Sequence, residues 1–309
     1  MLSGCSKRPL PDLVTGQESY FIAQNIRCEM RDDVRELILE GLASYGEDAE
    51  ITYLTEVGEA TEGAAEITAR RYGEFVSHRY RSLRSAGIRT MVERYSAGQV
   101  AYDFEFDIEE NNRTGGGIDI LSVITRGTIS TTVSGKLDAK RRNLRNFKVL
   151  DQFGELISNL PTARECRQLE RRENMAYPIS GKLNLREVLD TFISLNQSAN
   201  LVGNDKASDV PRMADTITYT TTIQGGIKPE LKLAPLGRDL QVAGANIDLW
   251  SQRVDIHKLI LALTLPKRNV PVASQRSVLE EVAIQELERQ RQREIDNEDH
   301  EVRRHLLNL

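Results

Sequence analysis

The sequence predicts an α+β protein. We expect two antiparallel β-rich modules, arranged as a sandwich or as packed sheets, with covering helices and a charged C-terminal helix. Apolar and acidic residues alternate strictly over residues 101–109, and alternation returns over 216–223, as in half-buried strands. Over 31–44 and 185–197, apolar residues instead recur every three or four positions, which is the spacing of amphipathic helices.

The chain is expected to begin with a tether and a mainly helical region. Residues 1–16 are polar and contain prolines, which suits a lipid-proximal tether, and residues 17–98 form the helical region. In the predicted helix over 31–44, Val34, Leu37, Ile38 and Leu42 form the apolar face, while Asp32, Asp33, Arg35 and Glu36 face outward. A second helix is predicted over 63–83.

The first β module is predicted over residues 99–160. Its glycine-rich stretch at 111–117 is expected to be a turn. Further strands are predicted at 118–124, 128–136 and 143–151.

A helical connection and a loop, over 161–212, separate this module from the next. Asn184 is a suitable N-cap for the helix over 185–197. The second β module is predicted over 213–270, and a charged helix fills 271–309. Both modules pass from an alternating strand through a glycine turn to further strands. This order suggests an internal duplication, although any two meanders share these features.

Composition excludes several classes of protein. The chain has 309 residues, with 39% apolar and 28% charged residues, which is typical of a globular protein with a buried core. A net charge of −5 argues against a nucleic-acid binder. No apolar run approaches the length that spans a bilayer, so any membrane attachment is expected to come from lipid.

The N-terminal segment Leu2-Ser3-Gly4-Cys5 resembles the cleavage site of bacterial lipoprotein signal peptides. The resemblance implies a lipid, such as palmitate, on Cys5 and a location in the cell envelope facing the periplasm. No basic or apolar signal region precedes the four residues, so we expect that region upstream of Met1. An ordinary cytosolic N-terminus that contains a cysteine is the alternative.

Cysteine number supports the same compartment. If Cys5 carries lipid, Cys28 and Cys166 remain, an even number in an oxidising periplasm. We therefore predict a disulfide between them. Two unrelated buried thiols are the alternative.

No motif for catalysis, cofactor binding or metal binding stands out, so no cofactor and no metal are expected. The four histidines, His78, His257, His300 and His305, do not pair with one another or with cysteine at zinc-ligand spacing. His257 and Asp255 are weak catalytic candidates within a predicted strand, where a packed histidine is the commoner case.

Three short segments, one rich in glycine, one acidic and one basic, each have a functional and a structural interpretation. Gly115, Gly116 and Gly117 follow a strand but lack the phosphate-loop pattern, so hairpin glycines are expected. The acidic side chains of 103–110 suggest calcium, but along a strand they form a row and do not converge. The basic run 140–145 suits either an anionic partner or protection of a sheet edge.

The leading functional hypothesis is a non-enzymatic, membrane-tethered periplasmic protein that acts as a structural or interaction module. Its expected partners are the membrane, through Cys5, and an envelope protein. One alternative is an envelope hydrolase with a site assembled from distant residues such as His257 and Asp255. Another is a small-ligand binder with its pocket between the two β modules. The segments 225–231 and 257–266 faintly resemble small β domains found beside trypsin-like proteases, but no function is transferred from them.

Overall fold

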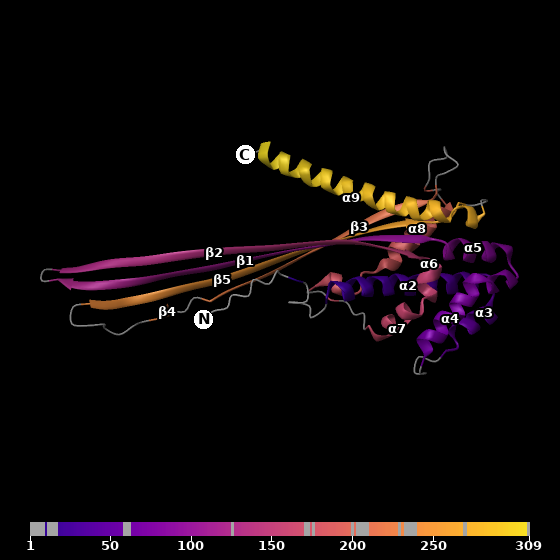
Figure 1. Cartoon of the computed structure of the whole chain (residues 1–309), viewed down its shortest axis with the longest axis horizontal. Helices are drawn as coiled ribbons and strands as arrows, with labels where there is room; N and C mark the ends of the chain where they lie inside the picture. Colours follow the sequence, from indigo (N-terminus) through magenta and orange to yellow (C-terminus); the bar gives the residue numbers. More distant parts are fainter. Residues whose placement is uncertain are drawn as a thin grey trace. The chain divides into compact units, whose positions relative to one another are not determined.

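A computed structural model of the chain describes residues 10, 18–57, 63–124, 127–169, 174, 177–198, 201, 210–227, 230–231, 240–267 and 271–307. Within these ranges, the side chains of 116–133, 227–248 and 298–307 lie outside the description. Helices and strands both contribute, so the α+β class is confirmed (Figure 1).

The helices lie before, between and after the strands. They are α2 (Ser19–Ser44), α3 (Asp48–Thr55), α4 (Ala64–Ser77), α5 (Ala86–Ser96), α6 (Phe153–Ser158), α7 (Leu160–Gln168), α8 (Leu185–Ser198) and α9 (Arg276–Leu307). Short 3-10 turns occur at Arg79–Ser82, Pro178–Ser180 and Val272–Ser274. The strands are β1 (Gln99–Ile124), β2 (Gly127–Gln152), β3 (Arg212–Ile227), β4 (Glu230–Leu231) and β5 (Leu240–Thr264).

The described strands form one sheet, in the order β2-β1-β5-β3, with β4 paired to β5. Strand β1 comes from the first predicted module and β5 from the second, yet they are neighbours. The expectation of two separate sheets is therefore wrong. Alternation identifies a strand, but it does not encode which strand pairs with it.

The expected turn at 111–117 is also wrong, because β1 runs through it to Ile124. The three glycines at 115–117 therefore lie within a strand and are not hairpin glycines. Glycine has no side chain to pack, but it can adopt extended backbone, and β1 continues because β2 and β5 flank it.

The chain separates into two compact units. The sheet unit comprises Met1–Gly16, Phe106–Arg145 and Tyr219–His257, and the helical unit comprises Gln17–Glu105, Asn146–Thr218 and Lys258–Leu309. The long strands contribute residues to both units.

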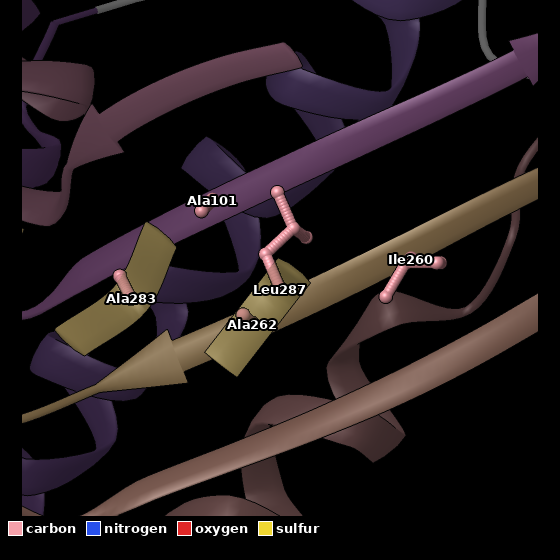
Figure 2. Close-up of a cluster of buried hydrophobic side chains, with 5 residues drawn as sticks. All are labelled: Ala101, Ile260, Ala262, Ala283 and Leu287. Carbon is pink, nitrogen blue, oxygen red and sulfur yellow. The ribbon is translucent and has the colours of Figure 1, made fainter. Parts of the chain in front are cut away.

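In the helical unit, α9 covers one face of the sheet. A buried apolar cluster joins helix and strands, and its members are Ala101 of β1, Ile260 and Ala262 of β5, and Ala283 and Leu287 of α9 (Figure 2). Each member is at most 3% exposed. Three of the five members are alanines, whose small side chains allow close approach of helix and strands.

Helix α2 is linked to the sheet through Arg27, whose guanidinium makes two hydrogen bonds, of 2.6 and 2.7 Å, to Asp151 at the end of β2. Other helices surround α2, so it is buried along much of its length and around much of its circumference. The expectation that Asp33 faces outward is wrong, since it is only 7% exposed.

A buried carboxylate of α2 supports the start of α8. Glu29 accepts hydrogen bonds from the backbone N–H groups of Leu183 and Leu185, at 2.8 and 2.9 Å. Between these residues Asn184 has a φ of 61°, in the left-handed region that asparagine tolerates better than most side chains. The start of α8 is thus fixed by a residue about 150 positions earlier.

Few of the described side chains of the sheet unit are both apolar and buried. Among its described side chains, Phe106 and Ile108 are the buried apolar ones. Ion pairs cross its strands instead, for example Arg142 to Asp107 and Arg141 to Glu110. Among the described residues of this unit, charge pairs across the strands are thus more prominent than buried apolar contacts.

Candidate functional site

The predicted catalytic pair lies in β5 and is buried. Asp255 and His257 are two residues apart, so their side chains share one face of the strand. They are 0% and 1% exposed, and His257 Nε2 lies 3.9 Å from Asp255 Oδ2. Asp255 also accepts two hydrogen bonds from Arg253, at 2.8 and 2.9 Å.

The His257 ring meets the ring of Phe106 edge to face, with 5.1 Å between centroids. Burial lowers the pKa of His257 to about 4, against the opposing effect of Asp255. The imidazole is therefore neutral near pH 7 and is enclosed among Phe106, Asp255 and the sheet. A general base must be able to reach a substrate, and His257 is enclosed. The arrangement therefore favours a structural role for His257, packed beside the Arg253–Asp255 ion pair.

The other predicted positions fall in different places. His78 is exposed at the end of α4, with its Nε2 3.7 Å from Glu74. The side chains of His300 and His305, and all of Cys5, lie outside the described residues. In the part of the chain that the structure describes, no group of three or more ligands gathers for a metal ion, and no helix is long and apolar enough to cross a bilayer.

The acidic and basic runs of the sequence meet each other across the β1–β2 pair. Lys140 Nζ lies 2.7 Å from Glu109 Oε1, and Nη2 of the neighbouring Arg141 lies 2.6 Å from Glu110 Oε2. Further back in β1, Asp103 is held by Arg291 of α9 at 2.7 Å. The opposite charges of the two runs could have predicted this pairing. Each run was considered alone in the sequence, so the pairing was not predicted.

The structure joins Cys28 of α2 to Cys166 of α7 in a disulfide, with 5.3 Å between the Cα atoms. The two residues are 138 positions apart in the sequence. The bond connects a helix that precedes β1 with one that follows β2.

A pocket of about 660 Å³ opens beside this disulfide, and we call it the arginine pocket. Its lining comes from α2, α3, α4 and α7 and consists of Arg31, Asp32, Arg35, Leu54, Thr55, Val57, Ala64, Ala65, Thr68, Ala163, Cys166, Arg167 and Leu169. Arg31 and Arg35 each contact Asp32, at 3.1 and 3.2 Å.

Local sequence explains why the two guanidiniums share this wall. Arg31 and Arg35 are four residues apart on α2, so they lie on one side of the helix. Arg31 is only 4% exposed, and the Arg35 guanidinium lies over the ring of Tyr72, 5.3 Å from its centroid. The i, i+4 spacing was visible in the sequence, but the walls that face it come from helices distant in the chain.

A larger open groove, of about 1130 Å³, lies between α2, α5 and α8. Its principal cation is Arg186, whose guanidinium contacts Glu36, Glu40 and Asp190 at up to 3.5 Å. Carboxylates therefore already surround the cation of this groove. The described lining of the arginine pocket contains three guanidiniums and one carboxylate, and the carboxylate of Glu66 interacts with Arg167 as well.

These features define an α+β protein with a disulfide-linked helical unit, an ion-paired sheet unit and an arginine-lined pocket. The chain belongs to the Y4kA family, described as "Uncharacterised protein y4kA", whose family model matches residues 8–296. It is 30% identical over 269 residues to the "Uncharacterized protein y4kA" of Sinorhizobium fredii (strain NBRC 101917 / NGR234), a match that covers 86% of this chain and 80% of that protein. The names state no activity, so function is argued from the residues themselves.

Proposed function

We propose that this protein is lipid-anchored at Cys5, faces the periplasm, and acts in the cell envelope as a non-enzymatic interaction module. One observation carries the proposal. Two of the three cysteines, Cys28 and Cys166, are placed in a disulfide, and the third lies in Leu2-Ser3-Gly4-Cys5. Disulfides persist in oxidising compartments such as the periplasm, and a lipoprotein cleavage site directs a chain to that side of the membrane.

The accessibility of the side chains supports binding as the mode of action. The candidate pair of His257 and Asp255 is closed to solvent, whereas large apolar side chains of the sheet unit are exposed. Leu137 and Leu144 on β2 are 67% and 53% exposed, and Ile223, Leu249 and Ile256 are exposed as well. We propose that a protein partner covers some of these exposed apolar side chains.

Cell fractionation tests the anchor. The gene, with its own upstream DNA, is expressed in its source bacterium with and without globomycin, which blocks lipoprotein signal peptidase. We expect the wild type in the membrane fraction, accumulation of a larger precursor with globomycin, and loss of the mature membrane-bound form in Cys5→Ala. Ser6→Ala, a substitution one residue beyond the cysteine, should behave as the wild type. A wild-type protein in the soluble fraction, unaffected by globomycin, would overturn the proposal.

A further inference from the structure

We propose that the groove between α2, α5 and α8, which we call the acidic groove, binds a basic amphipathic helix of a partner protein. The inference rests on the proposed interaction role and names the kind of partner for it. Three properties of the groove point to such a partner: its length, its apolar floor and the carboxylates at its rim.

The acidic groove is long enough for a helical segment. Its lining follows one side of each helix, from Leu37 to Tyr45 on α2, from Ala86 to Tyr95 on α5 and from Arg186 to Gln197 on α8. Each stretch covers roughly two to three turns, or about 12–17 Å. The groove is open, and its volume of about 1130 Å³ exceeds that of most small-ligand sites, so a peptide segment fits it better than a small molecule.

The floor of the groove is apolar. Leu37 of α2, Met91 of α5 and Ile193 of α8 belong to the lining and are buried or partly buried. A Cβ at Gly41 would overlap the Met91 side chain, so the missing side chain at this position lets α5 pack closely against α2. Tyr45 adds an aromatic ring, and this residue is 51% exposed. The apolar face of an amphipathic helix can be buried against such a surface.

The rim of the groove carries more carboxylates than cations. Glu36, Glu40 and Asp190 all contact the single guanidinium of Arg186, at up to 3.5 Å. Their side chains are 65%, 63% and 47% exposed, whereas that of Arg186 is 24% exposed. Each carboxylate offers about four acceptor sites and a guanidinium has about five N–H donors, so acceptor capacity remains for the cations of a partner.

Other charged groups nearby do not reverse this balance. Arg94 also belongs to the lining, but it is buried and donates to the carbonyl oxygen of Pro266, at 3.0 and 3.1 Å. Lys182 interacts electrostatically with Asp33, but so does the carboxylate of Glu29. In the helical unit as a whole, aspartate and glutamate outnumber lysine and arginine, whereas the reverse holds in the sheet unit. The groove therefore favours a cationic partner over an anionic one.

Fluorescence anisotropy of a labelled peptide, titrated with the full, oxidised chain, tests the proposal. The probe consists of about 14 leucine and lysine residues, with the leucines on one face of a helix, in about 0.15 M salt. We expect saturable binding with a Kd of about 1–100 µM. A peptide of the same composition in scrambled order, and one with glutamate in place of lysine, should each bind at least about tenfold more weakly.

A pair of threonine variants tests where the peptide binds. Thr90 is exposed in the lining, so Thr90→Arg places a long cationic side chain in the groove and should weaken binding at least about tenfold. Thr52→Arg introduces the same side chain at an exposed position on α3, outside the lining. This control should bind within about twofold of the wild type.

A second pair of variants tests the carboxylates. Glu40→Gln combined with Asp190→Asn removes two negative charges from the rim and should weaken binding about tenfold. The control combines Glu155→Gln on α6 with Asp296→Asn on α9, two exposed positions outside the lining. It should again bind within about twofold of the wild type.

Three results would overturn the proposal. One is the absence of saturable binding at up to about 0.5 mM protein that circular dichroism and the melting temperature show to be folded. Another is equal binding by either pair of variant and control, which would place the peptide elsewhere. The third is equally tight binding of the scrambled or the glutamate peptide, which would exclude recognition of a basic amphipathic helix. The titrations contain no lipid, so their failure leaves the membrane anchor standing, and failure of the fractionation test would not alter them.

Discussion

Asp33 shows how burial changes the chemistry of a single side chain. Burial, together with the carboxylates of Glu29 and Glu36, raises the pKa of Asp33 from 3.8 to about 7. The folded chain therefore holds this proton more tightly than the unfolded chain. The stabilisation from protonated Asp33 is complete below the ordinary carboxyl pKa and is lost as pH rises through 7.

We expect Asp33→Asn, which imitates the neutral carboxyl group, to raise the free energy of unfolding by about 2 kcal/mol near pH 8 and to change it little near pH 4. Urea unfolding at both pH values measures the difference. Asp296→Asn, at an exposed position on α9, is the control and should show no such pH dependence. A decrease in stability at high pH would contradict the assignment.

His257 has the opposite dependence on pH. Its pKa is lowered to about 4, so between pH 4 and 6.5 the unfolded chain binds a proton that the folded chain does not. Stability from neutral His257 is present above pH 6.5 and is lost as pH falls through this window. Charged neighbours are Asp255, Arg253 and Asp107.

We expect the wild type to lose about 2–3 kcal/mol between pH 7 and pH 4 through this group, and His257→Gln to lack that part of the loss. The measurement is the difference between the two urea-unfolding profiles across pH. His78→Gln, which changes an exposed histidine, should keep the wild-type profile. Parallel profiles for wild type and His257→Gln would show that the pKa of this histidine is the same in the folded and the unfolded chain.

Sequence patterns predicted exposure incompletely at this scale. The 3.6-residue period placed Asp33 and Arg35 on the outer face of α2, because it assumes that a helix has one buried side. Helix α2 is buried on several sides, so polar residues such as Gln24, Asn25 and Glu29 are also enclosed. No local pattern reports how many neighbours a helix has.

At the scale of elements, the disulfide connects α2 and α7 across the β1–β2 pair. We expect Cys28→Ala or Cys166→Ala to lower the free energy of unfolding by about 2–5 kcal/mol, since the bond closes a long loop. Urea unfolding with and without reductant measures this. Reductant should destabilise the wild type and leave the variants unchanged. Cys5→Ala serves as the control, and two free thiols besides Cys5 in the unreduced wild type would refute the disulfide.

Gly98 permits the junction of α5, β1 and α6 to close. Its carbonyl oxygen accepts from the N–H of Phe153 at 2.9 Å, and a Cβ at this position would lie 2.7 Å from the Phe153 ring and 2.8 Å from Leu265. We expect Gly98→Ala to cost about 1–3 kcal/mol of stability through overpacking, measured by thermal or urea unfolding. A Cβ at Gly135 in β2 would have no atom within 4 Å, so Gly135→Ala should change the stability little. Equal effects would exclude overpacking.

The elements that could be predicted were those with a strong local period. Helix α8 was expected over 185–197 and spans Leu185–Ser198. Helices α5, α6 and α7 were not predicted as such. Helices α6 and α7 are short, and tertiary contacts stabilise short helices more than sequence propensity does. Glycine-rich stretches were taken for turns, whereas pairing on both sides keeps β1 extended.

For the whole molecule, the contrast between the two units predicts uneven local stability. Backbone amides of 100–104 lie beneath buried side chains and α9, whereas those of 134–142 carry exposed side chains. We expect hydrogen exchange to be slower in the first segment by about tenfold or more. Exchange measured by mass spectrometry tests this. Equal protection along the whole sheet would show that the two units open together.

At the scale of the whole molecule, the sequence did not predict which distant segments lie together. The sequence identified strands in both halves of the chain, and the two cysteines that the structure joins were chosen by number alone. The arginine pocket was not predicted, because Arg35, Ala64 and Arg167 come together only when three helices pack. Each of these residues is ordinary in its own segment.

The adjacency of β1 and β5 has a consequence for how the protein is made. Synthesis reaches the end of β1 at Ile124, but β5 is complete only at Thr264, so one edge of β1 waits for its partner while about 140 further residues are added. A chain that ends early, for example through a nonsense mutation before residue 240, would present this edge permanently. Such fragments would be substrates for proteases or seeds for aggregation. The sheet therefore cannot be completed until β5 has been synthesised.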